Sequence, residues 1–185
     1  MSVISPKAPD AIRSRLLVLL NGQGAALYGG ERVTQLEHAL QSAALAEASG
    51  EQPAMILASL LHDLGHFFEA EFEQAMSSTL DARHEHMGSR YLSRWLGAEV
   101  TEPIRLHVEA KRYLCAVQPA YLKTLSDASI HSLSIQGGPM SAEEIAIFES
   151  CPFSSEAVRL RQYDDQAKII GMTTPDLAHF LSLIR

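Results

Sequence analysis

The 185-residue sequence has few of the features that mark secreted, nucleic-acid-binding or membrane-spanning proteins. Its two cysteines, Cys115 and Cys151, are too few and too widely spaced for a disulfide framework or a close metal-binding pair, so we expect reduced thiols. A formal net charge of -7, without clusters of Lys and Arg, argues against a nucleic-acid surface. No stretch approaches the roughly 18 to 20 apolar residues of a membrane span, and the N-terminus lacks a signal-peptide pattern. We therefore expect a cytoplasmic protein with no membrane partner.

The alternation of apolar and polar residues that builds a half-buried β-strand is also missing. The chain reads instead as helical segments separated by short breaks. With 46% hydrophobic and 20% charged residues, it is long enough to bury the core of one domain, and it shows no internal repeat or long linker. We predict an all-α fold, a compact helical bundle that forms a single domain over residues 1–185.

Helical periodicity and capping residues predict where the helices lie. Thr101 is expected to be an N-cap before Glu102 and Pro103, and Ser141 with Glu144 has the spacing of a capping box. The expected helices cover residues 11–20, 32–49, 54–68, 84–96, a segment from Thr101 through His107, 126–135, a segment opened by Ser141, and a last helix started by Thr174-Pro175-Asp176.

The strongest local signal is an apolar segment that is interrupted by His62, Asp63 and His66. Such groups are costly to bury without partners. On a helix, adjacent side chains project about 100° apart. His62 and Asp63 can therefore reach one ion only near the helix wall, which leaves the second carboxylate oxygen free to bridge to another ion. A lone buried histidine is more often a core residue, but further candidate ligands follow the same pattern along the chain: His38, His84, His107 and Asp164.

This ordered set of histidines and aspartates resembles the HD-domain superfamily, in the subset that carries two metals. Several motifs are similar, more closely, to the HD-type di-iron oxygenases of organophosphonate breakdown, which cleave 1-hydroxy-2-aminoethylphosphonate or its N-trimethyl form. The similarity runs over about residues 25–176. The motifs are Tyr28-Gly29-Gly30-Glu31, Gln35-Leu36-Glu37-His38, residues 61–66, residues 107–114, residues 136–140, and Arg161-Gln162-Tyr163-Asp164.

The resemblance implies a centre of two iron ions, Fe(II) and Fe(III). The first iron is expected to be held by His38, His62, Asp63 and Asp164. Asp63 is expected to bridge to the second iron, held by His84 and His107. Because His84-Glu85-His86 contains two imidazoles, either could be the ligand. The spacing to Glu85 and Gly88 favours His84, which leaves His86 near the centre or at the surface.

The resemblance also implies a set of substrate-binding residues. Four are expected to contact the phosphonate oxygens, three line other parts of the pocket, and Tyr28, His66 and Lys111 are the candidate catalytic residues. Tyr28 is expected to act as a reversible iron ligand or lid, and Glu31 to face the substrate amine. The four phosphonate contacts are His66, Lys111, Ser129 and Arg161, and the others are Tyr28, Glu31 and Gln136.

Each of these residues also has a plain structural interpretation. Lys and Arg are seldom buried and are usually solvated surface charges. His66 could support His62, since a histidine beside a metal ligand often orients it. The aromatic residues Tyr91, Trp95 and Tyr113 fall on apolar helix faces and favour core packing. We expect His131 and His179 at the surface.

Three functions remain open at this point. The favoured one is a di-iron oxygenase that uses O₂ to cleave the C–P bond of a small anionic hydroxyphosphonate, releasing phosphate and glycine or glycine betaine. The alternative is a metal-dependent phosphohydrolase, because the same ligands could activate water. The third is a degenerate HD domain that only binds a partner, which the full ligand set disfavours. We expect a monomer or weak homodimer.

Overall fold

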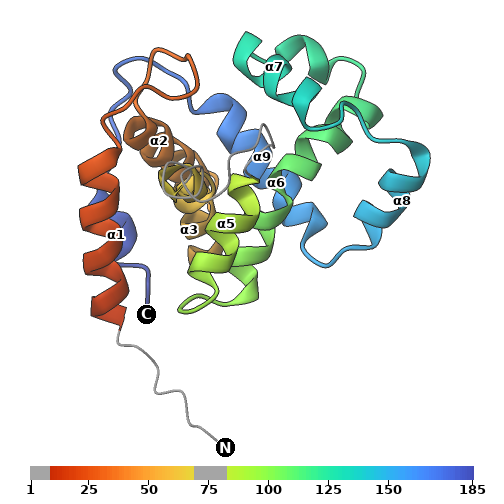
Figure 1. Ribbon diagram of the computed structural model, residues 1–185. Coiled ribbons are helices and arrows are strands. Elements are labelled where there is room, and N and C mark those ends of the chain that lie inside the picture. Colours follow the sequence, from red (N-terminus) through yellow and green to blue (C-terminus); the bar gives the residue numbers. More distant parts are fainter. Residues whose placement is uncertain (1–8, 69–82) are drawn as a thin grey trace, which may run out of the picture.

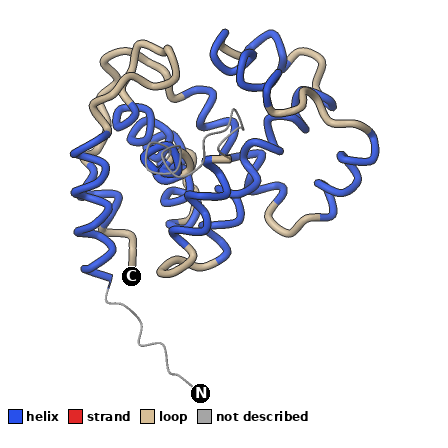
Figure 2. The backbone as a smooth tube through the Cα atoms, viewed as in Figure 1, coloured by secondary structure: helices blue, strands red, loops and turns tan. Residues whose placement is uncertain are grey.

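The computed structural model describes residues 9–68 and 83–185, so residues 1–8 and 69–82 of the predicted domain lie outside the description. Within the described residues it consists of helices and loops, with one isolated bridge between Leu27 and Thr34 in place of a sheet (Figure 2). The all-α prediction is confirmed. The elements are α1 (Pro9–Gln23), α2 (Gln35–Ala48), α3 (Pro53–Leu61), the 3₁₀ helix η1 (Leu64–Phe68), α5 (His84–Leu92), α6 (Ala98–Val117), η2 (Tyr121–Thr124), α7 (Asp127–Ile135), α8 (Ala142–Ser150), α9 (Ser154–Gln166) and α10 (Leu177–Leu181).

Side-chain caps determine where several helices begin. The predicted capping box at Ser141 and Glu144 is present and starts α8. A second one, Thr34 with Glu37, starts α2 at Gln35, three residues later than the sequence led us to expect. The last helix begins after Asp176, whose carboxylate accepts a hydrogen bond from the backbone N–H of His179 at 2.8 Å. In each case the cap binds an N–H group that the first turn leaves without a partner.

Thr101 is not an N-cap, and that prediction was wrong. Helix α6 begins at Ala98 after Gly97, so Thr101 lies inside the first turn and its hydroxyl donates to the Gly97 carbonyl at 3.2 Å. Pro103 therefore lies within the helix, where its missing N–H removes one intrahelical hydrogen bond. Buried residues on both sides of the proline, including Val100 and Ile104, continue the apolar face of α6. The packing of this face outweighs the local signal to end the helix.

The predicted helix over residues 54–68 is divided in two at the His62-Asp63 pair. Helix α3 ends at Leu61, and η1 begins at Leu64. A Cβ at Gly65 would come within 1.9 Å of the His84 carbonyl oxygen, so only glycine allows η1 to lie this close to the start of α5. The break and this close approach bring His84 towards His62 and Asp63.

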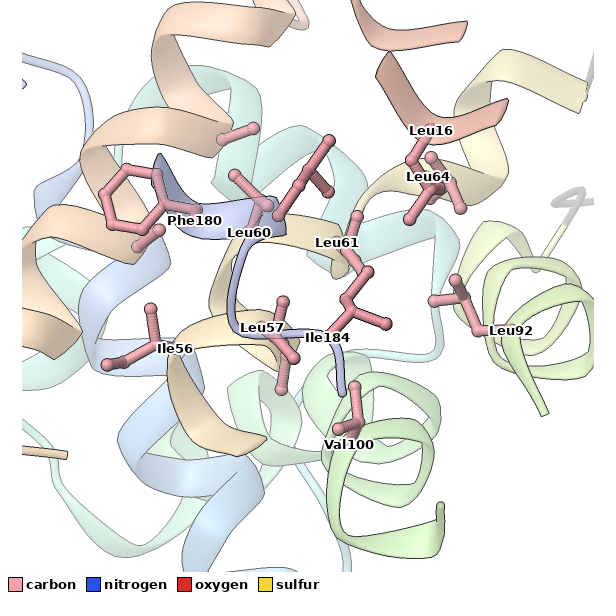
Figure 3. Packing of buried hydrophobic residues seen from close by; sticks show 14 of the residues in the cluster. Leu16, Ile56, Leu57, Leu60, Leu61, Leu64, Leu92, Val100, Phe180 and Ile184 are labelled. Carbon is pink, nitrogen blue, oxygen red and sulfur yellow. The ribbon is translucent and has the colours of Figure 1, made fainter. Parts of the chain in front are cut away.

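The main hydrophobic core surrounds α3. In Figure 3, Leu57, Leu60 and Leu61 lie among side chains from α1, α5, α6 and the C-terminal segment, including Leu16, Leu92 and Ile184. Seven of the nine residues of α3 are buried, which explains its continuous apolar sequence. Each fully buried aliphatic side chain contributes about 1.5–3 kcal/mol. The core therefore fixes α3, and with it the residues that follow at its C-terminal end.

Helix α6 connects this core to a smaller one. Val100 and Ile104 belong to the main cluster, whereas Leu106 and Ala110 pack with Phe148 of α8 in the second cluster. Figure 1 shows α7 and α8 at the opposite end of the molecule from α1 and α2, with α6 and α9 between. None of the helices in the described ranges has the length and apolarity needed to cross a bilayer.

Candidate dinuclear metal centre

Four side chains from three distant stretches of the sequence converge between α2, the end of α3 and α9. Nε2 of His38 lies 3.2 Å from Nε2 of His62 and 3.3 Å from Oδ1 of Asp164. Oδ2 of Asp63 lies 3.3 Å from Nε2 of His62 and 3.7 Å from Nε2 of His38. Such separations are those of donors that share one ion at about 2.0–2.2 Å. These four residues could therefore hold a metal ion.

A second group meets on the other side of Asp63. Oδ1 of Asp63 lies 3.3 Å from Nε2 of His84 and 3.6 Å from Nε2 of His107, and the two Nε2 atoms are 3.2 Å apart. The two oxygens of Asp63 are thus directed to two different histidine pairs. Such a carboxylate can bridge two ions. With Asp164 added beside His38, the first group offers four protein ligands and the second three.

Backbone carbonyls fix how the imidazoles are presented. Nδ1 of His38 lies 2.8 Å from the Ala167 carbonyl, Nδ1 of His62 lies 2.9 Å from that of Ser59, and Nδ1 of His107 lies 2.7 Å from that of Ile104. A carbonyl can only accept, so each Nδ1 carries the proton and donates it. In the neutral form of each ring the lone pair that a metal requires is therefore at Nε2.

The carboxylates have buried oxygen atoms that no hydrogen bond satisfies. Oδ2 of Asp63 and Oδ1 of Asp164 are inaccessible to solvent and lack a hydrogen-bond partner among the described residues. Oδ2 of Asp164 is bound by Nη1 of Arg161 at 2.6 Å. An unsatisfied buried carboxylate oxygen is costly, and both such oxygens face the His38–His62 group. The donor set is therefore the one that bound cations would complete.

The same proximity shifts the pKa values of these groups in the metal-free chain. Burial opposes protonation of His62, but the Asp63 carboxylate outweighs it and raises the pKa of His62 to about 9. Burial and the neighbouring His84 hold the pKa of His107 well below its usual value. Although burial alone would raise it, the cationic neighbours, above all Arg161, hold the pKa of the Asp164 carboxyl low. Both carboxylates are thus available as anionic ligands.

A cavity of about 480 Å³ opens beside the two groups. Its wall includes Asp63, His84, His107 and Asp164 of the candidate centre, and the cations Lys111, Arg161 and Lys168. Lys111 is 3% exposed and donates to the Ser132 hydroxyl at 2.7 Å. Burial and, next, repulsion by Arg161 lower the pKa of Lys111 to about 8. An acidic protein can thus present positive charge to a small anion.

Comparison with known proteins gives a consistent assignment. The HD domain model matches residues 36–147, which is more than half of the chain. The chain belongs to the HD domain family. It is 47% identical over 175 residues to hydroxymethylphosphonate dioxygenase of Gimesia maris, covering 94% of this chain and 87% of that protein. It is 42% identical over 167 residues to [1-hydroxy-2-(trimethylamino)ethyl]phosphonate dioxygenase (glycine-betaine-forming) of Leisingera caerulea, covering 90% of this chain and 85% of that one. The predicted resemblance to HD-type phosphonate oxygenases is confirmed.

This HD domain brings all the predicted metal ligands together. Of the two histidines in His84-Glu85-His86, His84 enters the second group, whereas the His86 side chain is 39% exposed and lies 3.6 Å from the Glu85 carboxylate. The helical face shared by His107 and Lys111 lines the cavity as expected. All seven predicted substrate-binding residues also line the cavity: Tyr28, Glu31, His66, Lys111, Ser129, Gln136 and Arg161.

Two rings extend the HD metal groups towards the cavity. The Tyr28 ring stacks on His38 with a centroid distance of 3.8 Å, and the His66 ring stacks on His84 at 3.9 Å. Burial and the Asp164 and Asp63 carboxylates raise the pKa of Tyr28 well above its usual value. Nε2 of His66 lies 3.9 Å from Oδ1 of Asp63. Tyr28 therefore covers a ligand of the first group, and His66 covers a ligand of the second group.

The structure also shows where sequence reasoning was incomplete. His131 is exposed, as predicted, but it lines the mouth of the cavity, whereas His179 pairs with Glu47 at 2.7 Å. The aromatic residues Tyr91, Trp95 and Tyr113 pack on the hydrophobic clusters, as expected. Lys168 lines the cavity and was missed. Its position four residues after Asp164 was the available signal, although α9 ends at Gln166, before Lys168.

Proposed function

We propose that this HD domain is a di-iron oxygenase that uses O₂ to cleave the C–P bond of a small 1-hydroxyphosphonate. The observation that carries the proposal is the position of Asp63, whose two oxygens face separate histidine pairs beside a cavity with cationic walls. The two relatives, which are named as dioxygenases of hydroxyphosphonates, support the reaction class.

The proposed reaction balances with O₂ as the sole oxidant. The C–P and C–H bonds of the hydroxyl-bearing carbon break, and that carbon becomes a carboxylate. The phosphonate group leaves as inorganic phosphate, so the products hold the four substrate oxygens and both atoms of O₂. The proton from carbon and that of the hydroxyl end on phosphate and in solvent. No further reductant is consumed in the overall conversion.

Imidazole and carboxylate donors suit iron, and the proposed ligands are His38, His62, Asp63 and Asp164 for one ion and Asp63, His84 and His107 for the other. Two iron ions held there would supply the redox chemistry that O₂ requires. Because the second group has three protein donors, it leaves more coordination positions for other molecules.

The chain's own residues bind and orient the anion. Lys111 and Arg161 place positive charge on the cavity wall, and Ser129 adds a hydroxyl on the same wall. His66 reaches the cavity beside His84. Charge-assisted hydrogen bonds from such groups are the ones that hold phosphonate oxygens most strongly. Arg161 also binds Oδ2 of Asp164, which directs Oδ1 towards His38.

Tyr28 is proposed to close the site until substrate enters. Its ring lies flat on His38, and it directly precedes Gly29, which lines the cavity and whose positive φ of 46° marks a turn. Movement of this turn would carry the phenol away from the first metal group and admit substrate oxygens. The excluded water would otherwise compete for the same positions.

The test is a comparison of O₂ uptake and phosphate release by the iron-loaded protein. We expect equal amounts of O₂ consumed and phosphate released from a 1-hydroxyphosphonate, and no phosphate without O₂. The control is Asp63→Ala, which removes the shared carboxylate and should abolish both signals. Release of phosphate from a simple phosphate ester under anaerobic conditions, with no reaction of the phosphonates, would overturn the proposal in favour of a phosphohydrolase.

A further inference from the structure

The two dioxygenase relatives differ in the group attached to the hydroxyl-bearing carbon, which is a trimethylammonium arm in one name and hydrogen in the other. We propose that Lys168 makes this cavity selective for 1-hydroxyphosphonates whose carbon substituent carries no positive charge. The inference rests on the proposed function and specifies its substrate class.

A cationic substituent needs an anionic or aromatic partner inside the cavity. Among the described residues that line it, the carboxylates are Asp63 and Asp164, which belong to the metal groups, and Glu31. Oε1 of Glu31 lies 3.3 Å from Nζ of Lys168, and the two side chains are 18% and 14% exposed. Glu31 is thus the one described cavity carboxylate outside the metal groups, and its charge is already compensated by Lys168.

The aromatic partner is engaged as well. The Tyr28 ring stacks on His38, and Nζ of Lys168 lies 5.8 Å from the centroid of the same ring. This separation is within the range in which a cation is attracted to a ring face. Lys168 thus occupies both contacts, a carboxylate and an aromatic face, that a substrate ammonium group would need.

Lys168 is held in place rather than extended into solvent. Its Nζ lies 3.2 Å from Oγ of Ser126 and 3.2 Å from Oγ of Ser129, in addition to Glu31. The two hydroxyl oxygens accept hydrogen bonds from the ammonium group, and the Glu31 carboxylate adds an ion pair. A substrate cation would therefore meet a fixed like charge in a cavity whose wall also includes Lys111.

The remaining wall suits a small uncharged substituent. Val108, Ala128 and Ile135 line the cavity with apolar side chains. A hydrogen atom or a short alkyl group can bind against these side chains without giving up hydrogen bonds to water. The phosphonate, in contrast, gains from each positive charge nearby. The same lysine should therefore favour the anionic end of the substrate and oppose a cationic one.

The experiment compares hydroxymethylphosphonate with 2-amino-1-hydroxyethylphosphonate and its N-trimethyl form on the iron-loaded protein. We measure kcat/KM from phosphate release and, separately, Kd by calorimetry without O₂. Hydroxymethylphosphonate is expected to be preferred by at least about tenfold in both measurements, because like charges a few ångströms apart repel strongly in a partly buried site. Lys168→Met should reduce that preference at least about tenfold, since it removes the charge and keeps the length.

Three matched variants locate the effect. Lys168→Arg retains the charge and should retain the preference. Lys123→Met removes an exposed lysine outside the cavity and should leave the preference unchanged. Lys168→Met should improve the binding of the amino substrates, because it leaves the Glu31 carboxylate free to attract them. Adding Glu31→Gln to Lys168→Met should remove that improvement. Circular dichroism of each variant confirms folding, and the Lys168→Arg comparison remains informative if Lys168→Met does not fold.

The outcomes separate this inference from the proposed function. If the wild-type protein prefers an amino substrate, or if Lys168→Met leaves the preference unchanged, Lys168 does not select the substituent although the oxygenase proposal stands. If none of the three phosphonates is consumed with O₂ while a phosphate ester is hydrolysed, the proposed function itself fails and the selectivity proposal fails with it.

Discussion

Oδ1 of Asp164 lies 3.3 Å from Nε2 of His38, although one residue precedes the His62-Asp63 pair in the sequence and the other lies near the C-terminus. The contact joins α2 to α9, and the second oxygen of Asp164 is bound by Arg161 one turn earlier on α9. One carboxylate thus connects the candidate metal centre to the cationic wall of the cavity. We therefore expect a substitution in the candidate metal centre to affect the cavity wall, and a substitution in the cavity wall to affect the metal centre.

The shared position of Asp63 predicts a difference in metal content between two variants. Asp63→Ala removes an oxygen from both groups and should lower bound iron from two ions per chain to less than one. His107→Ala affects only the second group and should leave about one ion per chain, because the ligands of the first group remain. Elemental analysis after iron loading and desalting measures the stoichiometry.

The matched control is His86→Ala, which removes a histidine two residues from His84 that points outside the second group. It should retain two ions per chain. Loss of one ion in this variant, with two retained in His107→Ala, would contradict the assignment of the second group.

A second prediction concerns the stability provided by Arg161. Arg161 is 4% exposed, and its guanidinium binds Asp164 at 2.6 Å and also binds Asp165. Arg161→Met would leave buried carboxylates without their cation, which typically costs about 3–5 kcal/mol of unfolding free energy. Arg159→Met removes a half-exposed arginine that binds Glu51 at 2.8 Å, and should cost about 1 kcal/mol or less. Urea-induced unfolding of both variants measures the difference. Equal losses would show that Arg161 is not needed to balance these carboxylates.

Much of the candidate centre could be predicted from the sequence because metal ligands come as recognisable residue types in a fixed order. His62 and Asp63 stand out since polar groups are rare in an apolar segment, and the order of the other ligands then identifies them. The helical class followed for a similar reason, from patterns that are local. The helix ends were less accurate, because caps such as Thr34 and the apolar face of α6 compete with local stop signals such as Pro103.

What the sequence could not give is which charges compensate one another. The ion pair between Glu31 and Lys168 joins the loop before α2 to the segment after α9, and no local pattern relates the two. The role of Asp165 was equally hidden, because its neighbour Asp164 matched the expected motif. Pairings of this kind depend on tertiary distances of a few ångströms, and they decide what the cavity accepts.

The pKa of Lys111 predicts how anion binding depends on pH. Burial, with repulsion from Arg161, lowers this pKa to about 8, so the ammonium loses its proton and its charge as the pH rises through 8. We expect kcat/KM for the phosphonate to fall above that pH, since kcat/KM reports groups of the free enzyme. Lys111→Arg keeps its charge throughout this range and should shift the decline to higher pH. A decline near pH 8 that is identical in Lys111→Arg would assign it to another group.

The pKa of His62 predicts an opposite pH dependence for folding and for metal binding. In the metal-free chain Asp63 outweighs the effect of burial and raises this pKa from 6.5 to about 9. The folded chain therefore keeps a proton that the unfolded chain releases. This stabilisation is fully present below pH 6.5 and is lost as the pH rises through 9. Between pH 6.5 and 8 the loss should amount to about 1.6 kcal/mol, less than the full slope of about 1.4 kcal/mol per pH unit because the unfolded histidine is half protonated at pH 6.5.

Urea unfolding of the chelator-treated protein at pH 6.5 and pH 8 measures this loss. His62→Gln should remove most of the difference, whereas His179→Gln, which alters an exposed histidine paired with Glu47, should leave it unchanged. Metal binding needs Nε2 of His62 without a proton, so metal affinity should rise over the same interval and binding should release a proton. If the metal-free protein were instead as stable at pH 8 as at pH 6.5, the folded chain would not hold the extra proton on His62.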